Sequence, residues 1–206
     1  MPATARYSST QHNELFSSIA KDLVNQGYSV QHNALPLDLS NQLFEKIQNT
    51  SCSTKNEATN WFEPASNKSA TDNKTKIING DNRTEQYWIN WSQELMSGLS
   101  QQLAMPLTSC NSHFSHYPAG THCCEHLDAT ETNSTRAITL IAFLNQGWEY
   151  GHGGHLVIRN PQQRENSICI QPLFRTVVAF LSKEFPHAVL PTWRDRYSIT
   201  SWFNHE

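Results

Sequence analysis

The sequence has no long apolar run, no block of basic residues and no Cys-x-x-Cys pair. The first absence argues against a transmembrane helix, in agreement with a mean hydropathy of −0.57. The lack of basic blocks and the net charge of −3 argue against nucleic-acid binding and against a membrane-binding surface. Residues 1–10 show no apolar segment typical of a secretory signal, so we expect a cytoplasmic protein with reduced cysteines.

A length of 206 residues fits one domain with a full hydrophobic core. Apolar residues recur at helical spacing over residues 11–26, in the segment after Pro36, and from Tyr87 to about Ala104, which predicts three helices. Asp38 or Ser40 is the expected N-cap of the second helix. We expect these helices to support the fold and to carry no chemistry.

Two short strands and a long polar segment separate these helices. Residues 28–30 and 77–78 have the β-branched and aromatic character of strands that lead into turns. From about residue 50 to residue 76, Ser, Thr, Asn and Lys dominate, which predicts a long loop. Such a loop is either a lid over a functional site or a variable surface insertion, and the composition favours neither.

From Thr108 onward the apolar pattern changes to short strands separated by Gly- and Pro-containing turns. The predicted strands are residues 109–117, 122–127, 136–144, 155–159, 167–170, 176–181, 187–190 and 197–203. Such a series predicts an α+β protein with a mainly β core, a double-stranded β-helix (jelly roll) whose supporting helices pack on one sheet. We expect a single domain over residues 1–206, with helical support and the polar loop in about 1–107 and the jelly-roll core in about 108–206.

Four residues in the strand-rich half suggest a metal site with a binding position for an anion. His126 and Asp128 are two positions apart, so in an extended segment they point to the same side, and His187 comes from a later strand whose Val189 should share its face. Two imidazoles and one carboxylate form the facial triad of non-haem Fe(II) oxygenases. Arg196 begins an alternating strand, and an arginine facing the interior requires an anion such as a dicarboxylate.

Each of these residues also has an ordinary interpretation. His126 and Asp128 can be a surface pair, His187 a buried core histidine, and Arg196 a solvent-facing charge on an edge strand. The neighbouring sequence His122-Cys123-Cys124-Glu-His126 raises the alternative of a structural zinc site. Adjacent cysteines on a strand point to opposite sides, which disfavours zinc. The order of His, Asp, His and Arg along the chain favours the iron interpretation.

The set His126-x-Asp128, Phe185-Pro-His187-Ala-Val-Leu and Arg196-Tyr-Ser-Ile-Thr-Ser-Trp-Phe resembles the 2-oxoglutarate- and Fe(II)-dependent dioxygenases. More narrowly, it resembles the hypoxia-inducible-factor prolyl hydroxylases and their bacterial relatives. The segments Tyr117-Pro118 and Arg136-Ala-Ile-Thr-Leu-Ile-Ala-Phe-Leu-Asn are also similar to this group. The resemblance extends over most of the chain and is strongest over residues 110–203.

The resemblance implies a role for each matching residue. His126, Asp128 and His187 would bind Fe(II), and Arg196 would form a salt bridge with the distal carboxylate of 2-oxoglutarate. The residues expected around the cosubstrate are Tyr117, Thr200, Trp202 and Val189, and Arg136 is expected to contact the substrate. No catalytic residue beyond the metal ligands is expected. O2 would be the oxidant, and ascorbate is a further candidate cofactor.

One position departs from the pattern. Animal members of the group have a tyrosine, whose hydroxyl helps to hold the distal carboxylate, where this chain has Phe143. Either the cosubstrate binds more weakly here, or Tyr117 compensates for the missing hydroxyl.

The implied reaction is hydroxylation of a prolyl residue in a protein substrate, with release of succinate and CO2. By analogy with relatives that act on translation proteins, elongation factor Tu is a first candidate substrate. One alternative is an oxygenase with the same mechanism that acts on another side chain or on a small molecule. Another is a non-catalytic jelly-roll module that binds a metal.

Overall fold

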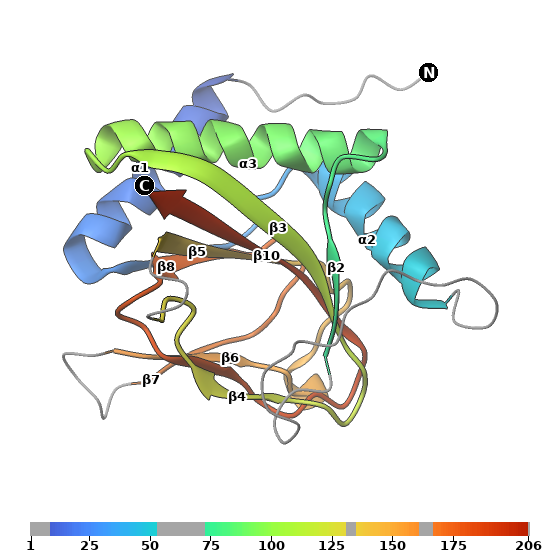
Figure 1. Cartoon of the computed structure of the whole chain (residues 1–206). Coiled ribbons are helices and arrows are strands. Elements are labelled where there is room, and N and C mark those ends of the chain that lie inside the picture. Colours follow the sequence, from blue (N-terminus) through green and yellow to red (C-terminus); the bar gives the residue numbers. More distant parts are fainter. Residues whose placement is uncertain (1–8, 53–72, 131–134, 161–166, 206) are drawn as a thin grey trace.

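The computed structural model describes residues 9–52, 73–130, 135–160 and 167–205. In the described residues, three helices and ten strands follow one another along the chain (Figure 1). The helices are α1 (Ser9–Gln26), α2 (Leu37–Cys52) and α3 (Arg83–Gln102). The strands are β1 (Tyr28–Gln31), β2 (Lys74–Ile77), β3 (Leu107–Tyr117), β4 (Cys123–His126), β5 (Arg136–Phe143), β6 (Leu156–Arg159), β7 (Ser167–Ile170), β8 (Val177–Leu181), β9 (His187–Val189) and β10 (Arg196–His205). A short 3-10 helix, η2, spans Tyr150–His152.

The strands form two antiparallel sheets. The larger sheet has the order β1-β8-β5-β10-β3-β2, and the smaller sheet has the order β4-β9-β6-β7. The helices cover one face of the six-stranded sheet, and the four-stranded sheet lies on its other side (Figure 1). The eight strands predicted after Thr108 are therefore confirmed, with ends that differ by three residues or fewer.

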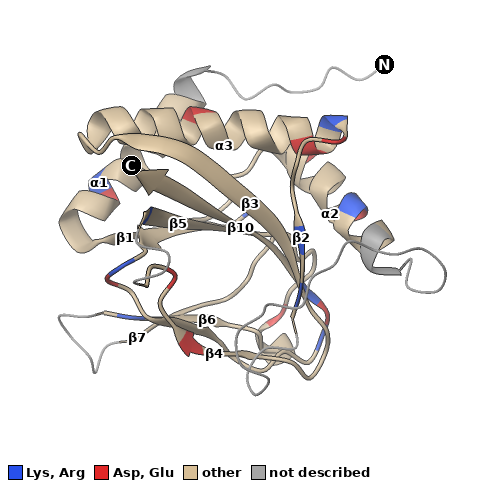
Figure 2. Cartoon of the chain, viewed as in Figure 1, with Lys and Arg blue, Asp and Glu red and all other residues tan. Residues whose placement is uncertain are grey.

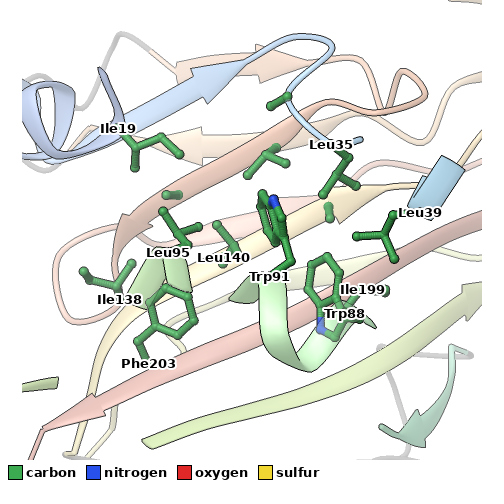
Figure 3. Close-up of a cluster of buried hydrophobic side chains, with 14 of the residues drawn as sticks. Ile19, Leu35, Leu39, Trp88, Trp91, Leu95, Ile138, Leu140, Ile199 and Phe203 are labelled. Carbon is green, nitrogen blue, oxygen red and sulfur yellow. The ribbon is translucent and has the colours of Figure 1, made fainter. Parts of the chain in front are cut away.

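One apolar cluster fills the space between the helices and the large sheet. Trp88 and Trp91 of α3 are fully buried in this cluster, which also contains Leu140 of β5 and Ile199 and Phe203 of β10 (Figure 3). These sheet residues alternate with side chains that face the smaller sheet, because successive side chains of a strand point to opposite faces. The β10 strand thus presents Ile199 and Phe203 to the helices and leaves its other face for the interior between the sheets.

A second apolar cluster lies between the two sheets. Its members include Ile141 and Phe143 of β5, Phe180 of β8, Leu156 of β6 and Val189 of β9. All five are buried. This space between the sheets is the one toward which the predicted site residues should point.

Two details of the N-terminal half differ from the prediction. The second helix begins at Leu37, so Asp38 and Ser40 lie inside its first turn, and the Ser40 hydroxyl donates back to the Pro36 carbonyl at 2.8 Å. Neither residue is therefore an N-cap. The predicted polar loop is shorter than expected, because α2 continues to Cys52 and β2 begins at Lys74. Most of the predicted loop, residues 53–72, lies outside the described residues, so the choice between a lid and a surface insertion stays open.

The strands β1 and β2 add to the large sheet at its two edges, where β1 pairs with β8 and β2 pairs with β3. The N-terminal half therefore contributes to the β core as well as covering it. Among the described residues, no helix has the length and apolar character needed to cross a membrane.

Candidate metal centre

The two predicted histidine ligands face each other across two strands. β4 and β9 are antiparallel, and His126 pairs in register with His187. Their ring centroids are 4.3 Å apart. Asp128 completes the group: its Oδ1 lies 3.7 Å from the Nε2 of His126, and its Oδ2 lies 3.6 Å from the Nε2 of His187. The three candidate ligand atoms lie within 4.8 Å of one another.

The prediction that strand periodicity brings Asp128 to the same side as His126 was wrong. β4 ends at His126, so Asp128 is not on the strand but in the bend that follows it. The bend is held by Arg136, whose Nη1 donates to the Asp128 carbonyl at 3.0 Å. Hydrogen bonding, rather than strand periodicity, therefore brings the carboxylate to the two imidazoles.

In both histidines the Nδ1 atom is hydrogen-bonded to a backbone carbonyl, which leaves the Nε2 atom available for a metal. The Nδ1 of His126 lies 3.0 Å from the Cys124 carbonyl, and the Nδ1 of His187 lies 3.2 Å from the Phe185 carbonyl. A carbonyl can only accept, so in the neutral form that binds a metal each ring keeps its hydrogen on Nδ1 and has a lone pair on Nε2. Two lone pairs then face a carboxylate, an arrangement that a cation between them stabilises. The donor set therefore fits a divalent iron with open positions.

The electrostatics of the site agree with a bound cation. Burial lowers the pKa of His126, but Cys123, the Cys124 carbonyl and Asp128 outweigh it and raise the pKa to about 9. Burial also lowers the pKa of His187, and here the nearby Asp128 carboxylate works against burial. Asp128 is buried with 7% exposure and His187 with 4%, whereas the His126 side chain is 44% exposed. The metal site therefore lies at the edge of the space between the sheets.

Arg196 is the second charged feature of this interior, and its predicted inward orientation is confirmed. The side chain is 1% exposed, and the Nε donates to the Gly154 carbonyl at 2.9 Å. The guanidinium carbon lies 5.1 Å from the ring centroid of Tyr117 and 5.0 Å from that of Phe143. Burial lowers the pKa of Arg196 to about 10, and among the described residues no carboxylate forms an ion pair with it. A buried cation without an anion partner is costly, so this position favours an acidic ligand.

The same face of β10 connects Arg196 with the metal site. Side chains alternate along the strand, so Arg196, Ser198, Thr200 and Trp202 share the interior face. Trp202 pairs in register with Thr139, whose hydroxyl donates to Asp128 at 2.8 Å. The Trp202 end of the strand is therefore the metal end, and Thr200 lies between it and Arg196.

The structure also places the other predicted contacts of the cosubstrate. Val189 is buried like His187, while Ala188 between them is partly exposed, so the predicted shared face is confirmed. Tyr117 is buried, its hydroxyl contacts Cys123, and burial raises its pKa. Tyr117 pairs in register with Arg196, which places it at the far end of the interior from Trp202.

Arg136 lies at the metal end beside Trp202. Its guanidinium carbon is 3.9 Å from the centroid of the Trp202 ring, and both side chains are partly exposed. The ring of His113 packs edge-on against Trp202 from the other side, with centroids 5.2 Å apart. Arg136 therefore lies at the partly exposed Trp202 end of β10, and its contact with a substrate stays a prediction.

The alternative of a zinc site receives no support from the described residues. Cys123 is buried and Cys124 is exposed, as expected for adjacent residues of a strand. Within the described part of the chain, the group of possible metal ligands that comes together is His126, Asp128 and His187, without a cysteine.

Two residues of the site were not predicted from the sequence. Thr139 binds the Asp128 carboxylate, and Ser182 binds Thr139. A signal for Thr139 existed, since it is the one hydroxyl in the otherwise apolar run Ala-Ile-Thr-Leu-Ile-Ala of β5. Nothing in the sequence around Ser182 indicated its role.

Comparison with known proteins also finds similarity to iron-dependent oxygenases. Residues 112–204 match the family model described as the 2OG-Fe(II) oxygenase superfamily. The chain resembles the 2-oxoglutarate- and Fe(II)-dependent dioxygenases. All three candidate metal ligands, as well as Arg196, lie within the matched residues.

Curated relatives are prolyl hydroxylases. The chain is 34% identical over 90 residues to human prolyl hydroxylase EGLN3 and 32% identical over 89 residues to human Egl nine homolog 1. The match with EGLN3 includes 42% of this chain and 37% of the relative, and the match with Egl nine homolog 1 includes 42% and 21%. The chain thus spans much less than the full length of these curated relatives.

Solved structures share the fold over nearly the whole chain. A Pseudomonas putida prolyl-4-hydroxylase has a TM-score of 0.83 and 26% identity, with 93% of this chain and 99% of that chain covered. A Trichoplax adhaerens prolyl hydroxylase, solved with a hypoxia-inducible-factor peptide fragment, has a TM-score of 0.85 and 23% identity, with 98% and 94% covered. The predicted architecture, a mainly β core with three helices as in 2-oxoglutarate oxygenases, is confirmed.

Proposed function

We propose that this protein is an Fe(II)- and 2-oxoglutarate-dependent dioxygenase that hydroxylates a prolyl residue of a protein substrate. One observation carries the proposal: the three-ligand group and a buried arginine, for which the described residues offer no carboxylate partner, share one interior between the sheets. A metal alone would explain His126, Asp128 and His187, but it would leave Arg196 unexplained. A dicarboxylate that binds a metal at one end and a guanidinium at the other accounts for both.

In this proposal the two sheets form a double-stranded β-helix that holds the reactants. His126, Asp128 and His187 would bind Fe(II), which, when bound, supplies the activation of O2 and the oxidative decarboxylation of 2-oxoglutarate. Arg196 would bind the distal carboxylate of 2-oxoglutarate, and Ser198 lies beside it, 3.4 Å from its Nη1. Thr200, Val189 and the other interior side chains would orient the cosubstrate and exclude water. Ascorbate is a candidate reductant for the iron.

The substrate would approach at the exposed metal end. His126 is partly open there, and Arg136 and Trp202 flank it. The Arg136 guanidinium has five N–H donors, of which the Asp128 carbonyl takes one, so others remain for substrate carbonyl oxygens. The curated relative EGLN3 and the Pseudomonas putida structure are both prolyl hydroxylases, which supports a prolyl substrate. The exposed edge of the candidate metal site suits a peptide or protein. Elongation factor Tu is the first substrate to test, by analogy alone.

The charge distribution supports a protein rather than a nucleic acid as substrate. Lysine and arginine residues are spread over separate elements, with aspartate and glutamate residues among them (Figure 2). A nucleic-acid substrate would require a concentrated basic surface.

The experiment measures succinate formation from 2-oxoglutarate by the purified protein with Fe(II) and O2, with and without elongation factor Tu. Mass spectrometry of the protein substrate then locates an added oxygen atom. The Asp128→Ala variant is the negative control, and ascorbate is added or omitted in parallel. The proposal requires succinate and hydroxyproline with the wild type only. Succinate formation with oxygen on another residue would replace the prolyl assignment, and no iron binding together with no turnover would refute the enzyme.

A further inference from the structure

A chain of hydroxyl groups leads from the interior of the fold to the carboxylate of Asp128. The Thr139 hydroxyl donates to Asp128 Oδ2 at 2.8 Å, and the Ser182 hydroxyl lies 2.8 Å from that of Thr139. Thr139 and Ser182 are fully buried, and Asp128 is 7% exposed. The chain is therefore shielded from water, which would otherwise compete for the same hydrogen bonds.

The chemistry of the groups fixes the direction of these hydrogen bonds. An ionised carboxylate only accepts, so the single hydroxyl hydrogen of Thr139 must point to Asp128. The contact between the two hydroxyls then requires Ser182 to donate to Thr139. Because a hydroxyl that accepts a hydrogen bond becomes a better donor, Ser182 strengthens the bond from Thr139 to Asp128.

The backbone of Ser182 is hydrogen-bonded both to β5 and to the residue that follows Asp128. Its N–H donates to the Ala137 carbonyl of β5 at 3.0 Å, and its carbonyl accepts from the N–H of Ala129 at 3.3 Å. Ala129 directly follows Asp128. Ser182 thus fixes both the strand that carries Thr139 and the bend that carries the carboxylate.

We propose that Thr139, supported by Ser182, is a positioning residue that sets how Asp128 binds the metal; this inference rests on the proposed function. Both carboxylate oxygens lie close to an imidazole, Oδ1 at 3.7 Å from His126 Nε2 and Oδ2 at 3.6 Å from His187 Nε2. Because the Thr139 hydroxyl already occupies Oδ2, Oδ1 is the better metal donor. A carboxylate that binds through one oxygen leaves more coordination positions open for a cosubstrate and O2 than one that binds through both. Without the Thr139 hydroxyl, the carboxylate is free to rotate.

The test uses Co(II) alone as the probe, titrated into the metal-free full chain. Its visible absorption reports both the affinity and the coordination of the ion, without any turnover. Thr139→Val removes the hydroxyl at nearly constant volume, Thr139→Ser keeps it, and Ser182→Ala removes only the supporting donor. Two buried, hydrogen-bonded residues provide matched controls: Thr176→Val loses a hydroxyl bonded to His32, and Ser112→Ala loses one bonded to Ser201.

Loss of a residue that orients a metal ligand typically weakens metal binding about 10- to 100-fold. We expect this loss and a changed absorption spectrum for Thr139→Val, a smaller loss for Ser182→Ala, and affinity close to that of the wild type for Thr139→Ser and both controls. Wild-type affinity and spectrum in Thr139→Val would overturn the inference and leave the proposed function intact. Equal losses in Thr139→Val and Thr176→Val would also overturn it.

The remaining outcomes are also decisive. Should circular dichroism show that Thr139→Val does not fold, the Ser182→Ala variant decides: weaker Co(II) binding than in Ser112→Ala supports the inference, and equal binding overturns it. Failure of the wild type to bind Co(II) would overturn both the inference and the proposed function.

Discussion

The guanidinium of Arg136 lies over the indole ring of Trp202, with its central carbon 3.9 Å from the ring centroid. The same guanidinium donates to the carbonyl of Asp128. One side chain thus joins the Trp202 end of β10 to the bend that carries the candidate metal ligand Asp128. Stacking on an aromatic ring holds an arginine in a defined orientation, so its remaining donors are presented in fixed directions.

Arg136→Ala should therefore impair use of the protein substrate more than use of 2-oxoglutarate. A charged hydrogen bond contributes about 1.5–3 kcal/mol, so we expect kcat/KM for the protein substrate to fall about 10- to 100-fold. Steady-state kinetics with each reactant varied in turn will measure the effect. The control is Arg83→Ala, an exposed arginine at the start of α3. Equal falls in kcat/KM for both reactants would show that Arg136 acts through the Asp128 bend, and an unchanged kcat/KM for the protein substrate would show that it has no role.

Bound metal should stabilise the fold through the three ligands. A ligand present at about 100 times its Kd stabilises the native state by about 2.7 kcal/mol. We therefore expect Mn(II), an Fe(II) substitute that air does not readily oxidise, to raise the Tm of the wild type in a concentration-dependent manner. EDTA should reverse the shift, and Asp128→Ala should abolish it. Differential scanning fluorimetry measures these shifts, with the exposed Asp81→Ala as control; a shift retained in Asp128→Ala would exclude Asp128 as a ligand.

The strands after Thr108 could be predicted because their signal is local. β10 shows the reason: Tyr197, Ile199 and Phe203 alternate with more polar residues, and the alternation identifies both the strand and its two faces. The strand β2 carried a weaker signal. Lys74-Thr-Lys-Ile is a short polar segment, and it becomes a strand because it pairs with the edge of β3, a partner that lies far away in the sequence.

The candidate metal site could also be predicted only in part. Spacing and order along the chain were sufficient to predict that His126, Asp128 and His187 come together and that Arg196 faces the interior. The contact between Thr139 and Asp128 was not predictable, because it depends on how the bend after β4 meets β5 in three dimensions. The expectation that an extended segment continues from His126 to Asp128 was wrong for the same reason: local periodicity cannot show where hydrogen bonds from another element end a strand.

Glu85 should make the stability of the helix layer depend on pH. Its carboxylate is 1% exposed, pairs with Lys46 at 3.1 Å, and accepts from the N–H groups of Gly80 and Asp81. Burial raises its pKa, but the hydrogen bonds from Asn82 and Lys46 and the charge of Lys46 outweigh burial, so the pKa lies below the usual 4.5. Because the pKa is lowered in the folded state, the stabilisation is present above about pH 4.5 and is lost as the pH falls through the lowered pKa.

Glu85→Gln should reduce the free energy of unfolding by about 1–3 kcal/mol at pH 7, the range for breaking a buried hydrogen-bonded charge. The difference from the wild type should shrink below about pH 4.5, where the unfolded carboxylate begins to bind a proton, and should shrink further as the pH falls through the lowered native pKa. Urea denaturation at several pH values measures both effects. Glu14→Gln, which changes an exposed glutamate of α1, serves as the control. A difference that stays constant down to acid pH would show that the ionised state of Glu85 is not the source of the stability.

Ser198 should take over part of the function of the tyrosine hydroxyl that Phe143 lacks. The two residues pair in register on β10 and β5, and the Ser198 hydroxyl lies 3.4 Å from Arg196 Nη1. Ser198→Ala should raise the KM for 2-oxoglutarate about fivefold, as expected for one hydrogen bond of about 1 kcal/mol. Ser201→Ala, which changes a buried serine on the opposite face of the same strand, should leave this KM unchanged. Adding Phe143→Tyr to Ser198→Ala should restore the lower KM, since it returns a hydroxyl to the same cross-strand pair; if it does not, Tyr117 is the remaining candidate donor near Arg196.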